Sequence, residues 1–193
     1  MTIRKLDYWV TLPKAPHEVH VLWYDPGGIT GWAHLCYDRR GFSSRSSKAL
    51  QYLRYWQCGE FEGDEEAQCS QAIQFAWQAR FSDRLSDVHV GTEDFDLVQT
   101  IGGKELLSPV RINAVLEYNL AQYSIRLRYQ RRVVRKQITP ERLRAFGFPG
   151  RWVTSGKGKD AFAAMQHAIV YSRRLKAAAD LGIWRQVNHH HGL

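Results

Sequence analysis

The feature that most constrains this chain is a short apolar run that ends in an acid. Residues 20–25 read His-Val-Leu-Trp-Tyr-Asp and are nearly continuously apolar. Such a run is typical of a strand that is buried on both faces. Pro26-Gly27-Gly28 follows and predicts a turn, and residues 31–37 predict a returning strand. The chain is therefore expected to hold the carboxylate of Asp25 at the end of a buried strand, beside a hairpin turn.

The rest of the pattern predicts a mixed α/β domain. Strands are expected over 51–61, 88–95 and 124–129, and helices over 64–84, 109–121, 139–147 and 160–176. This order, three strands followed by alternating helices and strands, predicts an α/β fold with a mixed five-stranded sheet and helices on both faces. We assign 1–18 to an N-terminal extension, 19–180 to one domain, and 181–193 to a C-terminal tail.

Charge points to a polyanionic partner. The 193 residues carry a formal net charge of +8, and residues 104–176 contain 16 Lys and Arg against 4 Asp and Glu. Residues 57–96 have the opposite balance, with 10 acidic and 2 basic residues. The second half is therefore expected to bind nucleic acid or a membrane surface, against the alternative of a merely basic protein.

The cysteines and the apolar runs bear on the compartment. Cys36, Cys58 and Cys69 have no CxxC spacing, and their odd number argues against a disulfide framework or a zinc site. The N-terminus resembles no secretory signal, and no run approaches the ~20 apolar residues that span a bilayer. We expect a cytoplasmic protein without a membrane partner.

Three acids stand where a cation site would form. Asp25 closes the first strand, Glu93 lies near the end of the fourth, and Asp160 opens the last helix. If the first and fourth strands are neighbours, two carboxylates meet at one edge, and an acid from a covering helix completes the group. Mg²⁺ prefers such oxygen ligands. Alternatively, Asp25 is only a turn former, Glu93 faces solvent, and Asp160 is only a helix cap.

Five segments resemble those of RuvC-type Holliday-junction resolvases, in particular their phage-like branch, within the ribonuclease H-like superfamily. The resemblance covers roughly residues 20–175. Its most specific part is the run Asp-Pro-Gly-Gly-Ile-Thr-Gly-Trp-Ala at 25–33. The weaker parts are Thr92-Glu93-Asp94-Phe95, Ser108-Pro109-Val110-Arg111-Ile112, Gln130 with Lys136, and Lys159-Asp160-Ala161 with His167.

This resemblance implies a ribonuclease H-like fold and a Mg²⁺-dependent endonuclease, with Mn²⁺ able to substitute. The substrate would be branched DNA such as a Holliday junction, hydrolysed to a 5′-phosphate and a 3′-hydroxyl. Asp25, Glu93 and Asp160 would be both the catalytic residues and the metal ligands, with Asp25 shared between two ions. A homodimer, acting in a bacterial or phage-infected cytoplasm, would match the two-fold symmetry of the junction.

Two departures from the family pattern keep alternatives open. Arg132 stands where a proline is expected after Gln130, and Ala163 stands where the last helix often carries a second acid. The chain could therefore be a degenerate nuclease fold that binds branched DNA without efficient cleavage. The Asp-Pro-Gly and Thr-Gly hairpin also resembles actin-like ATPases, but no second copy of that domain is present. His167 lies ~10 Å along the helix from Asp160, so we interpret it as a structural histidine that shares no metal.

Two surface predictions follow from the second half of the chain. The basic residues expected to contact DNA phosphates are Arg131, Arg132, Arg135, Lys136, Lys157 and Lys159, and a solvated basic face is the alternative for each. The helix over 109–121 carries an apolar stripe of Ile112, Val115, Leu116 and Leu120. That stripe either packs on the sheet, which is the stronger expectation, or forms the dimer interface.

Overall fold

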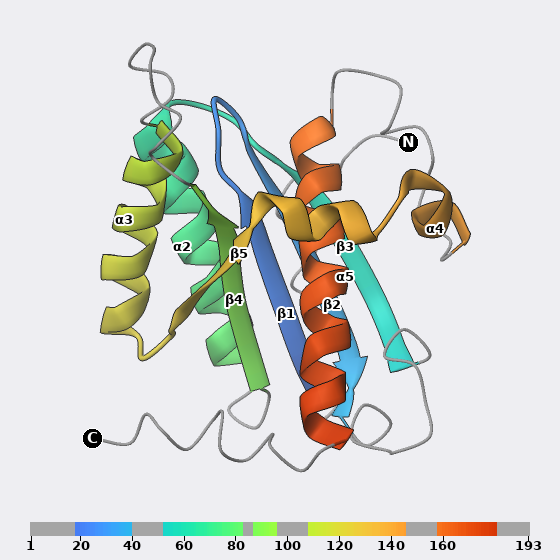
Figure 1. The fold of residues 1–193 in the computed structure, drawn as a ribbon. Coiled ribbons are helices and arrows are strands. Elements are labelled where there is room, and N and C mark those ends of the chain that lie inside the picture. The colour runs from blue at the N-terminus through green and yellow to red at the C-terminus, as the bar shows by residue number, and fades with distance from the viewer. Residues whose placement is uncertain (1–17, 40–51, 83–86, 96–107, 146–157, 181–193) are drawn as a thin grey trace.

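The computed structural model describes residues 18–39, 52–82, 87–95, 108–145 and 158–180. Five strands form one sheet (Figure 1): β1 (Glu18–Asp25), β2 (Thr30–Asp38), β3 (Leu53–Phe61), β4 (Asp87–Asp94) and β5 (Leu127–Arg131). Their order across the sheet is β3-β2-β1-β4-β5. β1, β2 and β3 pair antiparallel, whereas β4 runs parallel to both β1 and β5. The predicted mixed five-stranded sheet is confirmed, with β1 at its centre.

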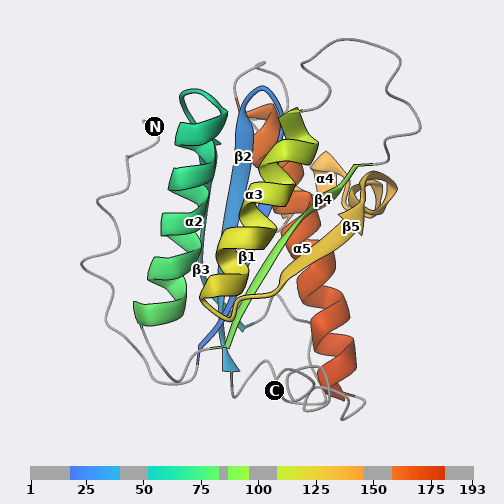
Figure 2. The ribbon, with the colours of Figure 1, turned by 90° about the vertical axis from the view of Figure 1, so that its left-hand side faces the viewer.

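Helices cover both faces of this sheet (Figure 2), as the sequence predicts. Two of them, α2 (Glu65–Ser82) and α3 (Ser108–Gln122), pack side by side on one face. The long helix α5 (Lys159–Asp180) covers the other face, crossing β1, β2 and β3. Between β5 and α5 lie a 3₁₀ helix, η5 (Arg132–Gln137), and the short helix α4 (Pro140–Ala145). Parallel connections to β4 and β5 require helical crossovers, which explains this layering.

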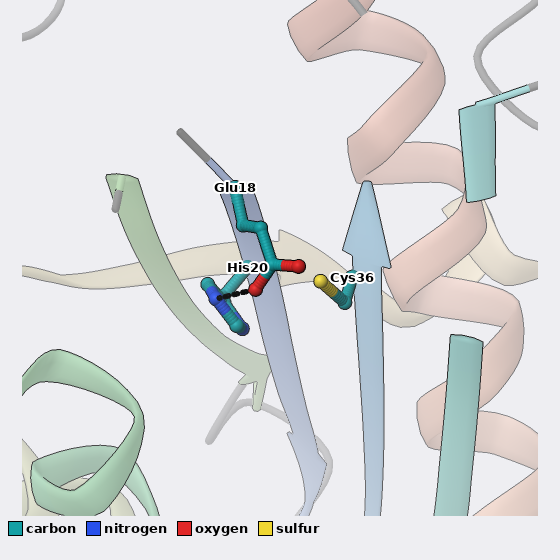
Figure 3. Close-up of side chains that lie close together, drawn as sticks. All are labelled: Glu18, His20 and Cys36. Carbon is teal, nitrogen blue, oxygen red and sulfur yellow. Dashed lines mark ion pairs between the residues drawn. The ribbon is translucent and has the colours of Figure 1, made fainter. Parts of the chain in front are cut away.

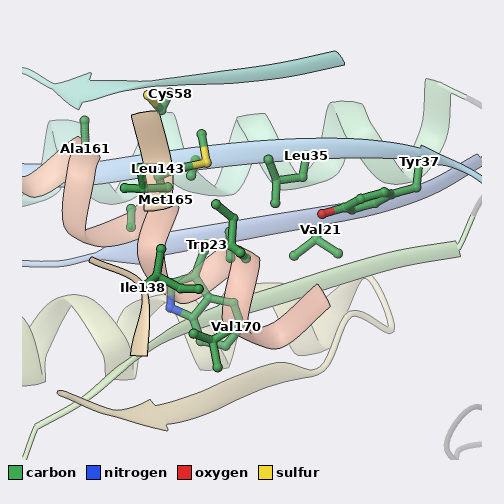
Figure 4. Packing of buried hydrophobic residues seen from close by; sticks show 14 of the residues in the cluster. Val21, Trp23, Leu35, Tyr37, Cys58, Ile138, Leu143, Ala161, Met165 and Val170 are labelled. Atoms are coloured by element: carbon green, nitrogen blue, oxygen red, sulfur yellow. The ribbon is translucent and has the colours of Figure 1, made fainter. Parts of the chain in front are cut away.

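Alternate residues of β1 supply both cores, which explains its continuously apolar sequence. Val19, Val21 and Trp23 face α5 and are fully buried. Leu22 and Tyr24 point the other way, toward α2 and α3. Figure 4 shows the α5-side core, where β1 and β2 pack against α5 and the α4 region. A central strand with helices on both faces cannot show apolar–polar alternation, because neither face meets water.

Capping residues explain where two of the helices begin. Asp64 accepts a hydrogen bond from the backbone N–H of Ala67 at 2.9 Å, so the acidic start predicted for α2 is confirmed. Thr139 caps α4 in the same way, accepting from the N–H of Arg142 at 3.3 Å. The turn between β1 and β2 is held by α2, because the side-chain amide of Gln68 donates to the carbonyl of Gly28 at 3.0 Å.

Several strands and helices begin or end at other residues than predicted. β1 begins at Glu18, so that residue belongs to the sheet and not to the extension. β5 starts at Leu127, three residues later than expected, because Ser124 has a φ of 56° and its N–H bonds back to α3. η5 was not predicted, since its residues 132–137 show no apolar period. α5 extends to Asp180, beyond the predicted end at residue 176.

The apolar stripe of α3 packs mainly inward, in agreement with the stronger of the two expectations. Ile112, Leu116 and Leu120 are fully buried against the sheet, and Val115 remains 40% exposed. Three of the four residues are therefore unavailable to a partner subunit. Within the described ranges, we find no helix with the length and apolar character that a bilayer span requires.

Candidate active site at the carboxyl ends of the strands

Asp25 and Glu93 meet at one edge of the sheet. β1 and β4 run parallel, and Tyr24 pairs with Thr92, so the next residue along each strand is the acid. Both side chains point to the α5 face and are buried, with exposures of 7% for Asp25 and 1% for Glu93. The sequence expectation that the two carboxylates lie side by side holds because β1 and β4 are neighbours.

Asp160 approaches this pair through a glycine. Gly31 pairs with Asp25 across the hairpin. A Cβ atom added to Gly31 would lie 2.0 Å from the carbonyl carbon of Asp160. The first turn of α5 therefore packs directly on the backbone of β2, which only glycine permits. Asp160 is half-buried there, close enough for its charge to act on Asp25.

An arginine lies between the two buried acids. Arg135 of η5 donates from Nη1 to Asp25 Oδ2 at 3.4 Å and to Glu93 Oε2 at 3.3 Å. Its side chain is only 18% exposed. Arg132 Nε lies 3.9 Å from the other oxygen of Glu93 but remains mostly exposed. The sequence predicted Arg135 as a DNA contact, whereas in this structure its guanidinium is turned inward onto the carboxylates.

His167 also contacts the site. Its Nε2 lies 3.1 Å from Glu93 Oε2, its Nδ1 lies 3.4 Å from Gln130 Oε1, and its ring stacks on Trp23. The ring is completely buried, as expected for a histidine under the sheet. Its separation from Asp160 does not exclude it from the site, because Glu93 extends along α5 to meet it. The signal in the sequence that could have placed His167 at the site is its spacing of seven residues from Asp160, which puts both on the same face of α5.

Buried neighbours fix the backbone and rings of this site. Asn113 on α3 donates to the carbonyl of Glu93 at 2.9 Å and accepts from Thr92 Oγ1 at 2.7 Å. On the opposite face, a Cβ added to Gly91 would lie 2.2 Å from the Trp23 ring. Gly91 thus makes room for the indole against which His167 stacks. Asn113 and Gly91 carry no sequence signal, because their role depends on packing between distant segments.

The pKa values of Asp25 and Glu93 shift in opposite directions. Burial, followed by the charge of Glu93, raises the pKa of Asp25 to about 8, although Arg135 opposes the shift. Burial also acts to raise the pKa of Glu93, but the hydrogen bond with His167 and the charge of Arg135 outweigh it and lower that pKa. Burial raises the pKa of Asp160, against the effect of Lys159. Asp25 is therefore the member of the pair that holds a proton more strongly.

These residues fit a hard divalent cation. Asp25 and Glu93 supply buried carboxylate oxygens, and the Arg135 guanidinium shows that a positive group can lie between them. Asp160 does not belong to this close pair. Among the residues that the structure describes, the three acids do not bring one oxygen each within 4.8 Å of both others. An ion held by all three would require Asp160 to move closer and Arg135 to withdraw.

The other predicted DNA contacts lie around this edge. Arg131 ends β5, Lys136 lies in η5 and Lys159 opens α5; all three are exposed. Lys157 lies outside the described residues. Exposed cations therefore lie on the elements that carry the acids or border them, at the end of the sheet where η5 packs against α5 (Figure 1).

The strand order, the pairing directions and the acids at the strand ends define a ribonuclease H-like fold. Within that class the fold is RuvC-like. It is similar to RuvC of T. thermophilus in complex with a Holliday junction substrate, with a TM-score of 0.51 and 10% identity, over 86% of this chain and 97% of that one. A second RuvC structure from Thermus thermophilus also has a TM-score of 0.51 and 10% identity, over 85% of this chain and 97% of that one.

No protein-family model matches the sequence, and no curated protein matches it. At 10% identity, the likeness to RuvC is one of fold. The assignment of individual site residues therefore rests on their own geometry.

Proposed function

We propose that this protein is a metal-dependent endonuclease that cleaves branched DNA such as a Holliday junction. The observation that carries the proposal is the buried pair of Asp25 and Glu93 at the ends of adjacent parallel strands, on a RuvC-like fold. Two buried carboxylates repel each other unless a cation lies between them. The exposed side chains of Arg131, Lys136 and Lys159 form what we call the basic rim. A cation site beside this rim suits a substrate made of phosphodiesters.

Each residue then has a role that its position suggests. Asp25, Glu93 and Asp160 would hold Mg²⁺ or Mn²⁺. When bound, the ion would supply a Lewis acid for hydrolysis of the phosphodiester bond. His167 would keep the Glu93 carboxylate in place, since it contacts one oxygen and is itself locked between Trp23 and Gln130. The exposed cations of the rim would position the DNA backbone.

Arg135 would exchange its partners as the site loads. In the structure described here its guanidinium contacts both acids. When a cation takes that place, like charges repel, and the guanidinium is freed for a DNA phosphate. This arrangement would let the same residue stabilise the acid pair and contact substrate. It reconciles the sequence prediction of a DNA contact with the inward position that we observe.

A second candidate function is binding without cleavage. Arg135 already compensates part of the acid charge, and Ala163, where relatives often have an acid, is a buried residue of α5. Both features would favour a degenerate nuclease that holds branched DNA and needs no ion. Substrate binding alone therefore cannot distinguish the two functions, and cleavage has to be measured directly.

The test is cleavage of end-labelled DNA by the full-length protein. A four-way junction, a flap, a fork and a linear duplex of the same sequence are incubated with Mg²⁺, with Mn²⁺, or with EDTA. We expect metal-dependent cutting of branched substrates over duplex, with 5′-phosphate ends. Junction binding without cutting at any concentration of either ion would replace the enzyme with the binding module. Cutting in EDTA would contradict the metal site.

Substrate binding should depend steeply on salt through the exposed rim. Replacing Arg131 and Lys136 together with alanine is expected to weaken junction binding and to lower the slope of log K against log salt by about 2, since each lost phosphate contact removes ~0.9. The matched control is Arg173→Ala with Arg174→Ala, which removes the same charge from exposed positions near the other end of α5. Equal slopes in both double variants would exclude the rim as the contact.

The proposed homodimer has a candidate surface on the face opposite the acids. A groove of about 900 Å³ runs between α2 and α3, lined by Trp77, Val115 and Tyr123 among others. Phe81, which is 50% exposed, packs against both aromatic residues. Acidic and basic side chains border the same groove, so a second copy placed by a two-fold axis would bring groups of opposite charge to its edges. A junction with two-fold symmetry needs two active sites to cut two strands, one from each subunit.

We expect Trp77→Glu to convert the dimer to a monomer, because it replaces an aromatic side chain that lines the groove with a charge. Light scattering at micromolar concentration measures the mass. Tyr118→Glu is the matched control, since Tyr118 is 70% exposed on α3 and does not line the groove. A dimer that survives Trp77→Glu, or a wild-type monomer both free and on the junction, would contradict this interface.

A further inference from the structure

The end of the sheet remote from the acids carries a second group of ligand-type side chains. Glu18 and His20 lie at the start of β1, and Cys36 lies opposite them on β2 (Figure 3). One ligand atom from each, a carboxylate oxygen, a ring nitrogen and the thiol sulfur, lies within 4.8 Å of both others. β1 separates this cluster from Asp25 by about 20 Å, at ~3.3 Å per residue. It is therefore independent of the site described above.

Strand register brings these residues together. His20 and Cys36 are direct cross-strand partners, and Glu18 is two residues before His20 on the same face. His20 is 3% exposed and Cys36 is fully buried. The Nε2 atom of His20 makes no hydrogen bond within the part of the chain that the structure describes, although Glu18 Oε2 lies 3.4 Å away. A buried nitrogen therefore faces the cluster with an incompletely used lone pair or proton.

Two members of the cluster, Glu18 and His20, are oriented by neighbours. Arg54 donates to Glu18 Oε1 at 3.1 Å, which leaves Oε2 facing His20. His34 Nε2 lies 2.9 Å from His20 Nδ1, which fixes the imidazole ring of His20. Oriented ligands with outer hydrogen-bond partners are characteristic of protein metal sites. Arg54 is partly exposed and contacts Glu18, so the cluster lies close to the protein surface.

We propose that Glu18, His20 and Cys36 form a binding site for Zn²⁺. A thiolate, an imidazole and a carboxylate together select a borderline transition metal and disfavour Mg²⁺, which prefers oxygen ligands only. Atoms bound to one tetrahedral ion lie about 3–4 Å apart, given metal–ligand distances of ~2.0–2.3 Å. The observed cluster needs only a small contraction to reach that spacing, and a water would fill the fourth position.

Binding exchanges protons for the ion. The Cys36 thiol loses its proton to solvent as the Zn–S bond forms, and Glu18 and Cys36 then balance the two charges of the ion. His20 must offer the lone pair of Nε2 to the ion, so its ring proton must lie on Nδ1. From there it is donated in a hydrogen bond to His34 Nε2. No redox step is involved. The ion would join β1 to β2 at the end of the sheet where the chain enters the fold.

The cysteine spacing does not reveal this site. We expected no zinc site because the three cysteines lack a CxxC pair, but this cluster uses one cysteine and two residues of another strand. Cys58 and Cys69 are buried elsewhere, Cys58 in the α5-side core and Cys69 on the buried side of α2. Only the pairing of β1 with β2 brings the three ligand types together.

The test uses Co²⁺ as a spectroscopic substitute for Zn²⁺. The full-length protein is reduced, stripped of metal with a chelator and titrated with Co²⁺. We expect a thiolate-to-cobalt charge-transfer band that Zn²⁺ abolishes by displacement. Cys36→Ser should lose the band, whereas Cys58→Ser, the matched control, should keep it. Ions held at Asp25 and Glu93 or by His189, His190 and His191 give no thiolate band, so they do not interfere.

A second measurement needs no variant. Zn²⁺ should slow alkylation of Cys36, read by mass spectrometry, without slowing that of Cys69. Absence of the band in wild type, persistence of the band in Cys36→Ser, or equal protection of both thiols would each overturn the zinc site. Mg²⁺-dependent cleavage by Cys36→Ser should match that of wild type, so failure here is separable from failure of the proposed nuclease.

Discussion

Asp25→Asn is expected to abolish cleavage while leaving junction binding nearly unchanged. The substitution keeps the shape of the side chain but removes a charged metal ligand, and a Lewis-acid ion contributes several kcal/mol to phosphoryl chemistry. The loss should be about a thousandfold or more in rate. Single-turnover cleavage of a labelled junction measures the rate, and a gel-shift titration measures the affinity.

The same variant should be more stable than wild type when metal is absent. Burial and Glu93 raise the pKa of Asp25 from 3.8 to about 8, so the folded state retains a proton that the unfolded chain loses above pH 4. The free energy of unfolding contributed by this group is therefore fully present below about pH 4 and is lost as the pH rises through 8. The amide of Asp25→Asn cannot ionise, so the variant should lack this decline.

Thermal melting in EDTA at several pH values measures the effect. The melting temperature of wild type should fall relative to that of Asp25→Asn as the pH rises from 5 to 8, by about 2–4 °C for each kcal/mol. Asp94→Asn is the matched control, because Asp94 is exposed beside Glu93. Parallel pH profiles for wild type and Asp25→Asn, or full cleavage by the variant, would contradict the acid pair as the catalytic site.

Gly31→Ala should be strongly destabilising. The added methyl group would lie 2.0 Å from the Asp160 carbonyl carbon and 2.4 Å from the Ala161 nitrogen, both backbone atoms that cannot rotate away. The first turn of α5 must shift, which we expect to lower the free energy of unfolding by about 3 kcal/mol. The melting temperature should fall by roughly 6–12 °C. Asp160 would move away from Asp25, so Mg²⁺ affinity should also drop.

Gly28→Ala provides the control in the same motif. A Cβ at Gly28 meets nothing within 4 Å, so that variant should melt close to wild type and bind Mg²⁺ normally. The comparison separates the close approach of α5 from any general effect of alanine in the turn. If both variants melt alike, Gly31 is not the point at which α5 touches the sheet. Asp25→Asn and Gly31→Ala should thus change stability in opposite directions while both impair catalysis.

The sequence by itself determined the α/β class, the three-strand start and the acids at the strand ends. The unbroken apolar run at 20–25 requires burial on both faces, and Pro26-Gly27-Gly28 requires a turn directly after Asp25. Both are local properties, because burial periodicity and turn chemistry act over a few residues. Apolar patterning also indicated that most of the α3 stripe packs inward.

Tertiary structure alone decided which side chains meet. Arg135 reaches the acids because η5 follows β5 closely, and His167 reaches Glu93 because α5 crosses the sheet over Trp23. Glu18, His20 and Cys36 meet only through strand register. Apart from Glu18 and His20, which are neighbours on β1, the residues that meet in these contacts are 16 to 110 positions apart. Local propensity carries no information about such pairs, because the packing of helices on a twisted sheet sets their distances.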